Sequence, residues 1–260
     1  MTWTRTTASV FVSVAVLAGC AANPALGPSE GEASEGVEAS AASSAAPATL
    51  GREEVELEAG TYRFDLTALS GGEEFPTFDA TIPAGWTSSG GWALGRPGVD
   101  GESLPVAVTF WNVDQVYGHP CQWEGTLVQP GPTVEDLVVA LVDVPMRNPT
   151  RPIEVELGGQ AGMYLEWSVP SDIAFDEPET FPDCDEDGQG NFDFRSWTGK
   201  GWASTRYHQG PGQIDRLWIL DVDGTRLVID AFVMADAPER AVEELMTILE
   251  SIRFLDDGPG

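Results

Sequence analysis

The chain has 260 residues and a formal net charge of −29, with 42 acidic residues against 13 basic ones. Because phosphate binding needs a basic surface, this balance excludes nucleic acid as a partner and predicts no charge-driven adhesion to anionic lipid head groups. The apolar content, including nine Trp, indicates a globular part large enough for one sizeable core or two small ones.

The first residues have the layout of a signal peptide. Arg5 and the free amine supply a thin positive region, and a mostly apolar stretch follows from Ala8 to Leu17. Ten residues are too few to span a bilayer, which takes about 20. We therefore expect residues 1–19 to be removed rather than to fold.

The stretch ends in Leu17-Ala18-Gly19-Cys20, which resembles the lipobox of bacterial lipoproteins. The resemblance implies a diacylglyceryl thioether on Cys20 and cleavage just before it. Two acyl chains hold a protein stably on a membrane, whereas one chain holds it only marginally. The expected location is the extracytoplasmic face of the cell membrane. An ordinary secretory signal with an incidental cysteine is the alternative.

Residues 20–52 differ in composition from the rest of the chain. Ala, Ser, Gly, Pro and Glu dominate, and the segment has no aromatic residue. Such a segment cannot bury enough apolar surface to offset its ordering entropy. We predict a disordered tether with an r.m.s. reach of roughly 30 Å, followed by a single domain at residues 53–257.

The predicted elements of this domain are mostly strands. In chain order the strands are Thr61–Leu69, Phe75–Pro83, Pro105–Val113, Ile153–Leu157, Gly162–Pro170, Phe192–Trp197, Trp202–Tyr207, a hairpin over Ile214–Met234, and Ile252–Phe254. Asp223-Gly224 in the middle of the hairpin is a strong two-residue turn signal.

Two helices are predicted among these strands. The first begins after Thr133, which is a good N-cap with Asp136 at the capping-box position. The second begins near Ala237 with Asp236 as its cap. It places four apolar residues on one face: Ala241, Leu245, Ile248 and Ile252.

An antiparallel sheet flanked by a few helices is an α+β fold. The sequence "FDATIPAGW", from Phe78 to Trp86, resembles the opening of PsbP-like domains, and "LWILDVDGTRLVIDAF" followed by "ELMTILESIRF" resembles their closing half. Actinobacterial lipoproteins of the LpqN type are similar in layout. The resemblance implies a sheet sandwiched by helices and a non-catalytic binding or accessory role toward an unidentified ligand or protein of the cell envelope.

Cys121 and Cys184 are the two cysteines that remain beyond Cys20. Outside the cytoplasm two thiols allow one pairing, which would close a loop of about 60 residues. Metal ligation or catalysis is the alternative, although the chain has no CxxC and neither cysteine has a histidine at metal-ligand spacing. We predict a disulfide.

The segment "DCDEDGQGNFD" resembles the first half of a calcium-binding loop, in which alternating oxygens wrap a hard cation. The candidate ligands are Asp183, Asp185, Asp187, Gln189, Asn191 and Asp193. Phe194 stands where such a loop has a bidentate Glu. The alternative is a solvated acidic loop in a very acidic protein, so Ca²⁺ is a possible cofactor and no other is predicted.

Common catalytic motifs are missing from the chain, which lacks H-E-x-x-H, G-x-S-x-G and S-x-x-K. His119 and His208 with a carboxylate would suit Zn²⁺ or acid–base chemistry, or they are loop histidines near the disulfide and a turn.

Most of the Trp beyond Cys20 are expected in the core, with one or two free to stack a flat ligand. These are Trp86, Trp92, Trp111, Trp123, Trp167, Trp197, Trp202 and Trp218.

Two functions remain open. The first is a non-catalytic binding lipoprotein of the envelope, and the second is an extracytoplasmic hydrolase with a carboxylate or His site. An apolar pocket without convergent titratable groups would favour the first.

Overall fold

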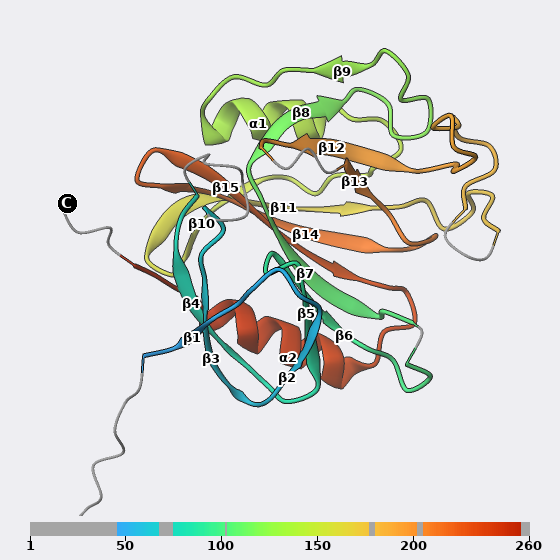
Figure 1. Cartoon of the computed structure of the whole chain (residues 1–260). Helices are drawn as coiled ribbons and strands as arrows, with labels where there is room; N and C mark the ends of the chain where they lie inside the picture. The colour runs from blue at the N-terminus through green and yellow to red at the C-terminus, as the bar shows by residue number, and fades with distance from the viewer. Residues whose placement is uncertain (1–45, 68–74, 102, 177–179, 202–204, 256–260) are drawn as a thin grey trace, which may run out of the picture. The chain divides into compact units, whose positions relative to one another are not determined.

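A computed structural model describes residues 46–67, 75–101, 103–176, 180–201 and 205–255. Cys20, the predicted signal peptide, most of the predicted tether and Trp202 lie outside the described residues. The described part contains three sheets and two helices, α1 (Val134–Val142) and α2 (Glu239–Glu250) (Figure 1). The predicted α+β class, an antiparallel sheet flanked by a few helices, is confirmed.

The central sheet has eight antiparallel strands. Their order across the sheet is β10 (Ile153–Leu157), β11 (Gln160–Ser168), β14 (Ile214–Val222), β15 (Thr225–Val233), β7 (Val106–Trp111), β6 (Ala93–Arg96), β5 (Trp86–Ser89) and β2 (Val55–Leu57). The β14–β15 hairpin lies near its middle, and its turn has positive φ at Asp223 and Gly224. This is the two-residue turn that Asp-Gly favours, so the predicted hairpin is confirmed.

Two smaller sheets accompany the central one. The first has the order β1 (Ala48–Thr49), β3 (Gly60–Phe64), β4 (Phe78–Ile82) and β16 (Arg253–Phe254). The other, which we call the third sheet, has the order β13 (Thr205–Tyr207), β12 (Arg195–Gly199), β8 (Val113–Tyr117) and β9 (Leu127–Val128). The chain passes from the central sheet to the third sheet at Asn112, so the single strand predicted over Pro105–Val113 is divided there.

Each face of the central sheet packs on a different core, because successive side chains along a strand point to opposite faces. One core joins Val106, Val108 and Phe110 of β7 to α2 and the first small sheet. The other core joins Trp111 and the facing residues of β14 and β15 to α1 and the third sheet. The predicted apolar face of α2 is buried in the first core through Ala241, Leu245 and Ile248, and Ile252 just beyond the helix is buried with them.

The two helices begin differently. Thr133 and Asp136 form the predicted capping box of α1, with the Asp136 N–H donating to Thr133 Oγ1 and the Thr133 N–H donating to Asp136 Oδ2. Asp236 does not cap α2, contrary to prediction. The N-cap is Pro238, which makes no side-chain cap bond. Proline fits there because its fixed φ suits the position and its missing N–H is not needed.

The folded part begins earlier than the predicted end of the tether at residue 52. Ala48–Thr49 pair with β3 in parallel, and the Leu50 N–H donates to the Arg63 carbonyl. Leu50 is buried in the core. Composition alone did not predict that residues 48–50 are ordered, because their partner strand, β3, follows them in the chain.

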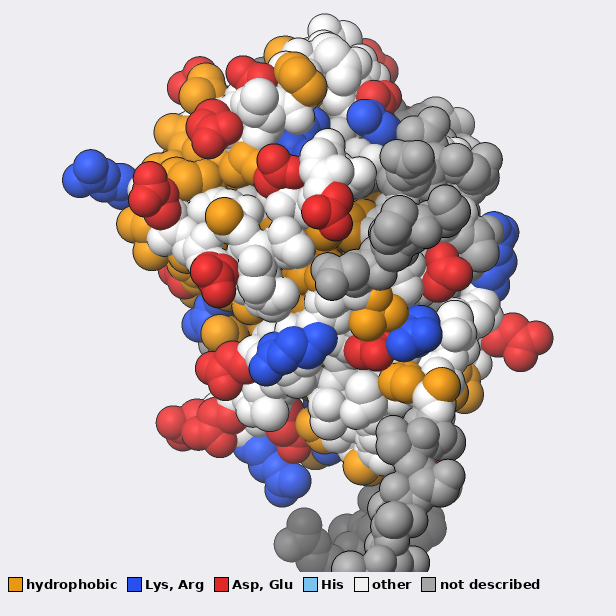
Figure 2. Space-filling model, turned by 90° about the vertical axis from the view of Figure 1, so that its left-hand side faces the viewer, with side chains coloured by type: hydrophobic (Ala, Val, Ile, Leu, Met, Phe, Trp, Pro, Cys, Tyr) orange, Lys and Arg blue, Asp and Glu red, His pale blue; other side chains and the backbone are white. Residues whose placement is uncertain are grey.

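On the face that Figure 2 presents, the acidic side chains are spread out and do not form one patch. Acidic and basic side chains are interspersed there, with hydrophobic side chains between them. Several of the few arginines pair with carboxylates at the surface, as Arg63 does with Asp79 and Arg240 with Glu244. Among the described residues, no helix has the length and apolar character needed to cross a membrane.

Candidate functional site

A hollow of about 490 Å³ lies on the face of the central sheet that carries Trp111. Its floor is made of small side chains that follow the strand register. Thr87, Gly95 and Ala107 form one row across β5, β6 and β7, and Ser89, Ala93 and Thr109 form the next row. We call this hollow the aromatic pocket because four aromatic residues line it: Trp92, Trp111, Tyr207 and Phe232.

The aromatic side chains that line the pocket differ in their exposure to solvent. Trp111 and Phe232 are almost fully buried, whereas Trp92 is half-buried and Tyr207 is 48 % exposed. The Trp92 and Trp111 rings meet edge to face with their centroids 5.0 Å apart. Trp111 also donates its indole N–H to Thr109 Oγ1 at 2.7 Å, which holds the ring against the floor. The pocket therefore has one fixed indole and one with accessible surface.

A cluster of buried charges lies next to the aromatic pocket, and Arg206 belongs to both. The Arg206 guanidinium donates Nε–H to Asp230, Nη2–H to Asp215 Oδ1 at 3.2 Å, and Nη1–H to the Tyr207 carbonyl. Arg147 donates to Asp215 Oδ2 at 2.7 Å. We call Arg147, Arg206, Asp215 and Asp230 the charge network; it joins the third sheet and the loop after α1 to the central sheet.

Aromatic rings take the place of hydrogen-bond partners for part of Arg147. Its Nε and Nη1 have no hydrogen-bond partner among the described residues. The guanidinium carbon lies 4.4 Å from the Trp167 ring centroid and 5.2 Å from that of Phe194. A desolvated cation over an aromatic face gains electrostatic stabilisation, so these rings compensate for the missing acceptors.

The network also sets the protonation states of its acids. Burial acts to raise the pKa of Asp215, but His208, Arg147 and Arg206 outweigh burial and hold this pKa well below its ordinary value. Burial raises the pKa of Asp230 to about 6, against the opposing effect of Arg206. Burial lowers the pKa of Arg147 to about 10, which still leaves the guanidinium charged at neutral pH.

Ser196, His208 and Asp215 lie in the order of a nucleophile, base and orienting acid. His208 Nε2 is 2.6 Å from Ser196 Oγ, and His208 Nδ1 is 3.3 Å from Asp215 Oδ2. Ser196 is, however, completely buried, so a substrate cannot reach its hydroxyl.

The histidine of this row is also unsuited to act as a base. Its Nε2 faces Arg147 Nη2 at 3.1 Å. Burial, reinforced by the Arg147 guanidinium, lowers the pKa of His208 to about 3 although Asp215 acts in the opposite direction. A general base needs a pKa near the working pH, so this arrangement favours a structural role.

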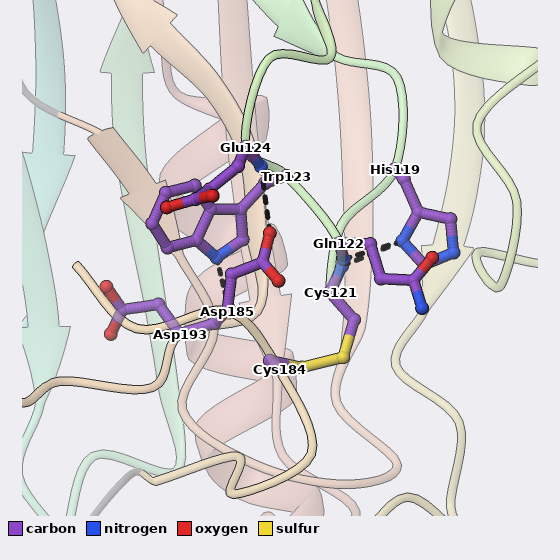
Figure 3. Close-up of a disulfide and its surroundings, with 8 residues drawn as sticks. All are labelled: His119, Cys121, Gln122, Trp123, Glu124, Cys184, Asp185 and Asp193. Carbon is purple, nitrogen blue, oxygen red and sulfur yellow. Dashed lines mark hydrogen bonds between the residues drawn. A yellow bond between two sulfur atoms is a disulfide. The ribbon is translucent and has the colours of Figure 1, made fainter.

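Cys121 and Cys184 form the predicted disulfide, with their Cα atoms 4.4 Å apart (Figure 3). The bridge joins the segment after β8 to the predicted calcium loop. His119 stands beside it as a loop histidine, and its Nδ1 accepts hydrogen bonds from the Gln122 N–H at 2.8 Å and the Cys121 N–H at 3.2 Å. The structure thus gives His119 and His208 different partners.

Three carboxylates of the predicted calcium loop, those of Asp185, Asp187 and Asp193, face protein donors. Asp185 Oδ2 accepts from the Glu124 N–H at 2.9 Å, and Asp187 Oδ1 accepts from the Gln189 and Asn191 N–H groups. Asp193 pairs with Arg195, and its carbonyl accepts from the Trp123 indole (Figure 3).

These contacts have two consequences for the loop. Hydrogen bonds from the Asn191 side chain and the Gln189 N–H lower the pKa of Asp187, so the loop stabilises this carboxylate with its own donors. Among the described residues, including Asp183, no three His, Cys, Asp or Glu side chains are grouped as metal ligands. The predicted ligand set is therefore not assembled in this conformation.

Most of the tryptophans in the described part of the chain are buried, as predicted. Of the seven described, six are buried, namely Trp86, Trp111, Trp123, Trp167, Trp197 and Trp218. Trp92 is the half-buried one, and it lies at the aromatic pocket.

Sequence reasoning missed Arg147, Arg206, Asp215 and Asp230. A signal was present for Asp230, which stands in the run "LVIDAFVM" with apolar neighbours on both sides. A lone carboxylate at an inward position of a buried strand needs a buried cation, and the chain has few basic residues to supply one.

A larger hollow of about 830 Å³ lies between the start of α1 and strands β10 and β11. Its lining includes Glu135, Glu154, Glu156 and Asp221. Its cation, Arg226, donates to the carbonyls of Gly131, Thr133 and Val113. The capping box already satisfies the start of α1 and Arg226 is bonded to backbone carbonyls, so the aromatic pocket is the better candidate site.

Comparisons with known proteins give no family. No protein-family model and no curated protein matches the chain. Among the solved structures that match, a Bacteroides thetaiotaomicron protein is similar to 70 % of this chain at 10 % sequence identity and a TM-score of 0.31. The match spans 46 % of that protein's chain.

We predict that Asp215→Asn destabilises the protein by about 3–5 kcal/mol, because it leaves two buried guanidinium groups without their shared carboxylate. Urea unfolding followed by Trp fluorescence measures the loss. Asp79→Asn is the matched control, since it removes the carboxylate of the surface pair with Arg63 and is expected to cost much less. Equal losses in the two variants would contradict a stabilising role for the charge network.

We predict that the double variant Cys121→Ser, Cys184→Ser loses roughly 4 kcal/mol of stability, because the bridge closes a loop of about 60 residues in the unfolded chain. Thermal and urea unfolding with and without dithiothreitol provide the measurement. The native protein should lose stability on reduction, and the double variant should not respond. Two alkylatable thiols in unreduced native protein would show that the bridge does not form.

Proposed function

We propose that this chain is a lipoprotein, anchored at Cys20 on the extracytoplasmic face of the membrane, that binds a small molecule in the aromatic pocket without catalysing a reaction. The observation that carries the proposal is the pocket itself. Ligand sites are concave and mostly apolar, with a few placed polar groups and volumes of about 300–1,000 Å³. The aromatic pocket has this character, with Trp92 accessible and Thr109 and Arg206 at its inner side.

The neighbouring titratable groups support binding rather than catalysis. Asp215 and Asp230 are fully buried and paired with arginines, and His208 stays neutral because its pKa is about 3. A hydrolase would need one of these groups to reach a substrate and to exchange a proton near neutral pH. Labelling of Ser196 by a fluorophosphonate probe would favour the hydrolase alternative.

The disulfide supports the proposed location, because structural disulfides persist mainly in oxidising compartments. The anchor itself rests on Leu17-Ala18-Gly19-Cys20. The PsbP-like layout remains part of the proposal, and an accessory role toward an envelope partner is compatible with a protein that presents a bound ligand.

We predict that Cys20→Ala abolishes lipid attachment, because the thioether has no other sulfur at that position. The variant should remain an uncleaved precursor or leave the membrane fraction, and it should lose incorporation of radiolabelled fatty acid. Cys121→Ser is the control, since it removes a cysteine that does not carry the lipid. Membrane attachment with full label uptake in Cys20→Ala would overturn the anchor.

We predict that Ala93→Trp blocks ligand binding, because an indole on the pocket floor fills the space above β6. Native mass spectrometry of the full chain extracted in detergent should detect a retained small molecule that the variant lacks. Ala161→Trp is the matched control, since it makes the same change on an exposed strand residue of the other hollow. Equal retention in the two variants would place the ligand outside the aromatic pocket.

A further inference from the structure

We infer that the free edge of β10 is a docking site for an extended segment of another protein, in which basic residues alternate with apolar ones. The segment would add one strand to the central sheet by main-chain pairing. Three features support this: the length of the edge, the different chemistry of its two faces, and the acidic hollow beside it. The site is separate from the aromatic pocket, which lies over β5, β6 and β7.

β10 is the longest edge strand in the part of the chain that the structure describes. It has five residues, whereas the strands at the other sheet edges, β1, β16, β2, β13 and β9, have two or three. Its register with β11 runs through five pairs without a shift. Proteins usually protect an edge by making it short or bulged, or by placing Pro or Lys on it. β10 has none of these devices, and its only charges are two glutamates.

The main-chain groups that point to this edge belong to Glu154 and Glu156. The turn that joins β10 to β11 has two residues, Gly158 and Gly159, both with positive φ, so the pair that flanks it is the first of the ladder. In such a ladder every second residue bonds to the partner strand, and the residues between direct their N–H and C=O groups outward. No described strand pairs with β10 on that side, so these groups are placed to bond an added strand.

The two faces of β10 require different side chains from a partner. Ile153, Val155 and Leu157 lie toward the first core, where Ile153 is 53 % exposed and the other two are half-buried. Glu154 and Glu156 alternate with them and are exposed on the opposite face. Residues directly opposite each other on two strands share a face. An added strand with alternating apolar and basic residues would therefore match both faces of β10.

The hollow of about 830 Å³ extends the acidic surface on the glutamate side. Besides Glu154 and Glu156, its lining includes Glu135 at the start of α1 and Asp221 on β14. Arg226, the cation of this lining, donates to backbone carbonyls. A strand lying along β10 could extend long Lys or Arg side chains into this hollow, where carboxylates attract their charges.

Charge disfavours the two occupants that this chain could itself supply. A second copy pairing through β10 would bring glutamates beside glutamates, and like charges at opposed positions destabilise a sheet. The predicted tether is acidic as well, with four Glu and no basic residue over 21–45. The net charge of −29 instead attracts a basic partner. A basic segment of a different protein is therefore the occupant that suits this edge.

The test is a short fluorescent peptide in which Lys alternates with Val, titrated against the full chain in detergent with anisotropy as the readout. A peptide of the same composition, with all Lys before all Val, is the control for net charge. The alternating peptide should bind saturably and the block peptide much more weakly, because only alternation puts every Lys on one face of a strand. Equal binding of the two peptides would overturn the inference, since it would show only non-specific attraction to an acidic protein.

Paired charge reversals locate the site. Glu154→Lys with Glu156→Lys should weaken binding of the alternating peptide by about tenfold, because two attractions become repulsions. The matched control is Glu56→Lys with Glu58→Lys, which makes the same change in net charge at exposed positions with the same spacing, at the opposite edge of the sheet beside β2. This control should bind almost as the native protein does. Equal weakening in the two double variants would exclude β10 as the site.

Hydrogen exchange of β10, followed by mass spectrometry, separates strand addition from charge attraction. The bound alternating peptide should slow exchange of the Glu154 and Glu156 amides, because their N–H groups become hydrogen-bonded. N-methylation of the peptide amides along one edge should abolish binding, whereas methylation along the other edge should be tolerated. Unchanged exchange in β10, or binding that survives methylation of either edge, would overturn strand addition. The proposed small-molecule site is tested separately by the retained ligand, so the two proposals can fail independently.

Discussion

The shared carboxylate of Asp215 is the constraint on which the second core depends. It accepts from Arg147 in the loop after α1 and from Arg206 on β13, and it lies on β14 in the middle of the central sheet. Three parts of the fold therefore meet at one buried acid. Because a buried charge without a partner is very costly, movement of the third sheet or of the loop after α1 away from Asp215 is strongly disfavoured. Apolar contacts alone would allow more sliding.

The fixed position of the third sheet explains why there is a pocket. The third sheet and α1 cover β11, β14 and β15, as the shared core shows, whereas the same face of β5, β6 and β7 carries the aromatic pocket. Large side chains on these strands would have closed the hollow, but the sequence has Gly, Ala and Thr there. The arginine that fixes β13 is also the one that lines the pocket, so docking and the shape of the site have a common origin.

Local signals in the sequence predicted the elements well, and long-range pairings account for what was missed. The Asp223-Gly224 turn and the Thr133 capping box each depend on a few adjacent residues, and both are present. Strands β5 and β6 are four residues each and contain Ser, Thr and Gly, so their stability depends on pairing with neighbouring strands and on the burial of Trp86 and Leu94 in the first core. Of the candidate site, Trp92 was within the predicted set, but Arg206 and Asp230 were not, because their pairing joins distant segments. The calcium pattern was a local signal, but Asp185 accepts from the distant Glu124 N–H, whereas Asp187 accepts from donors within its own loop.

The disulfide has a consequence for the order in which the chain folds. The pairing of Val116 on β8 with Trp197 on β12 joins residues far apart along the backbone. Cys121 follows β8 closely, and Cys184 precedes β12 closely. Once the two sulfurs are joined, the shortest covalent path between these strands runs through the bridge, and their association becomes a short-range event with a smaller loop-closure entropy. Oxidation before assembly of the third sheet would thus give the pairing of β8 with β12 a local route, and the chain between the cysteines, with α1, β10 and β11, would complete the fold as a closed loop.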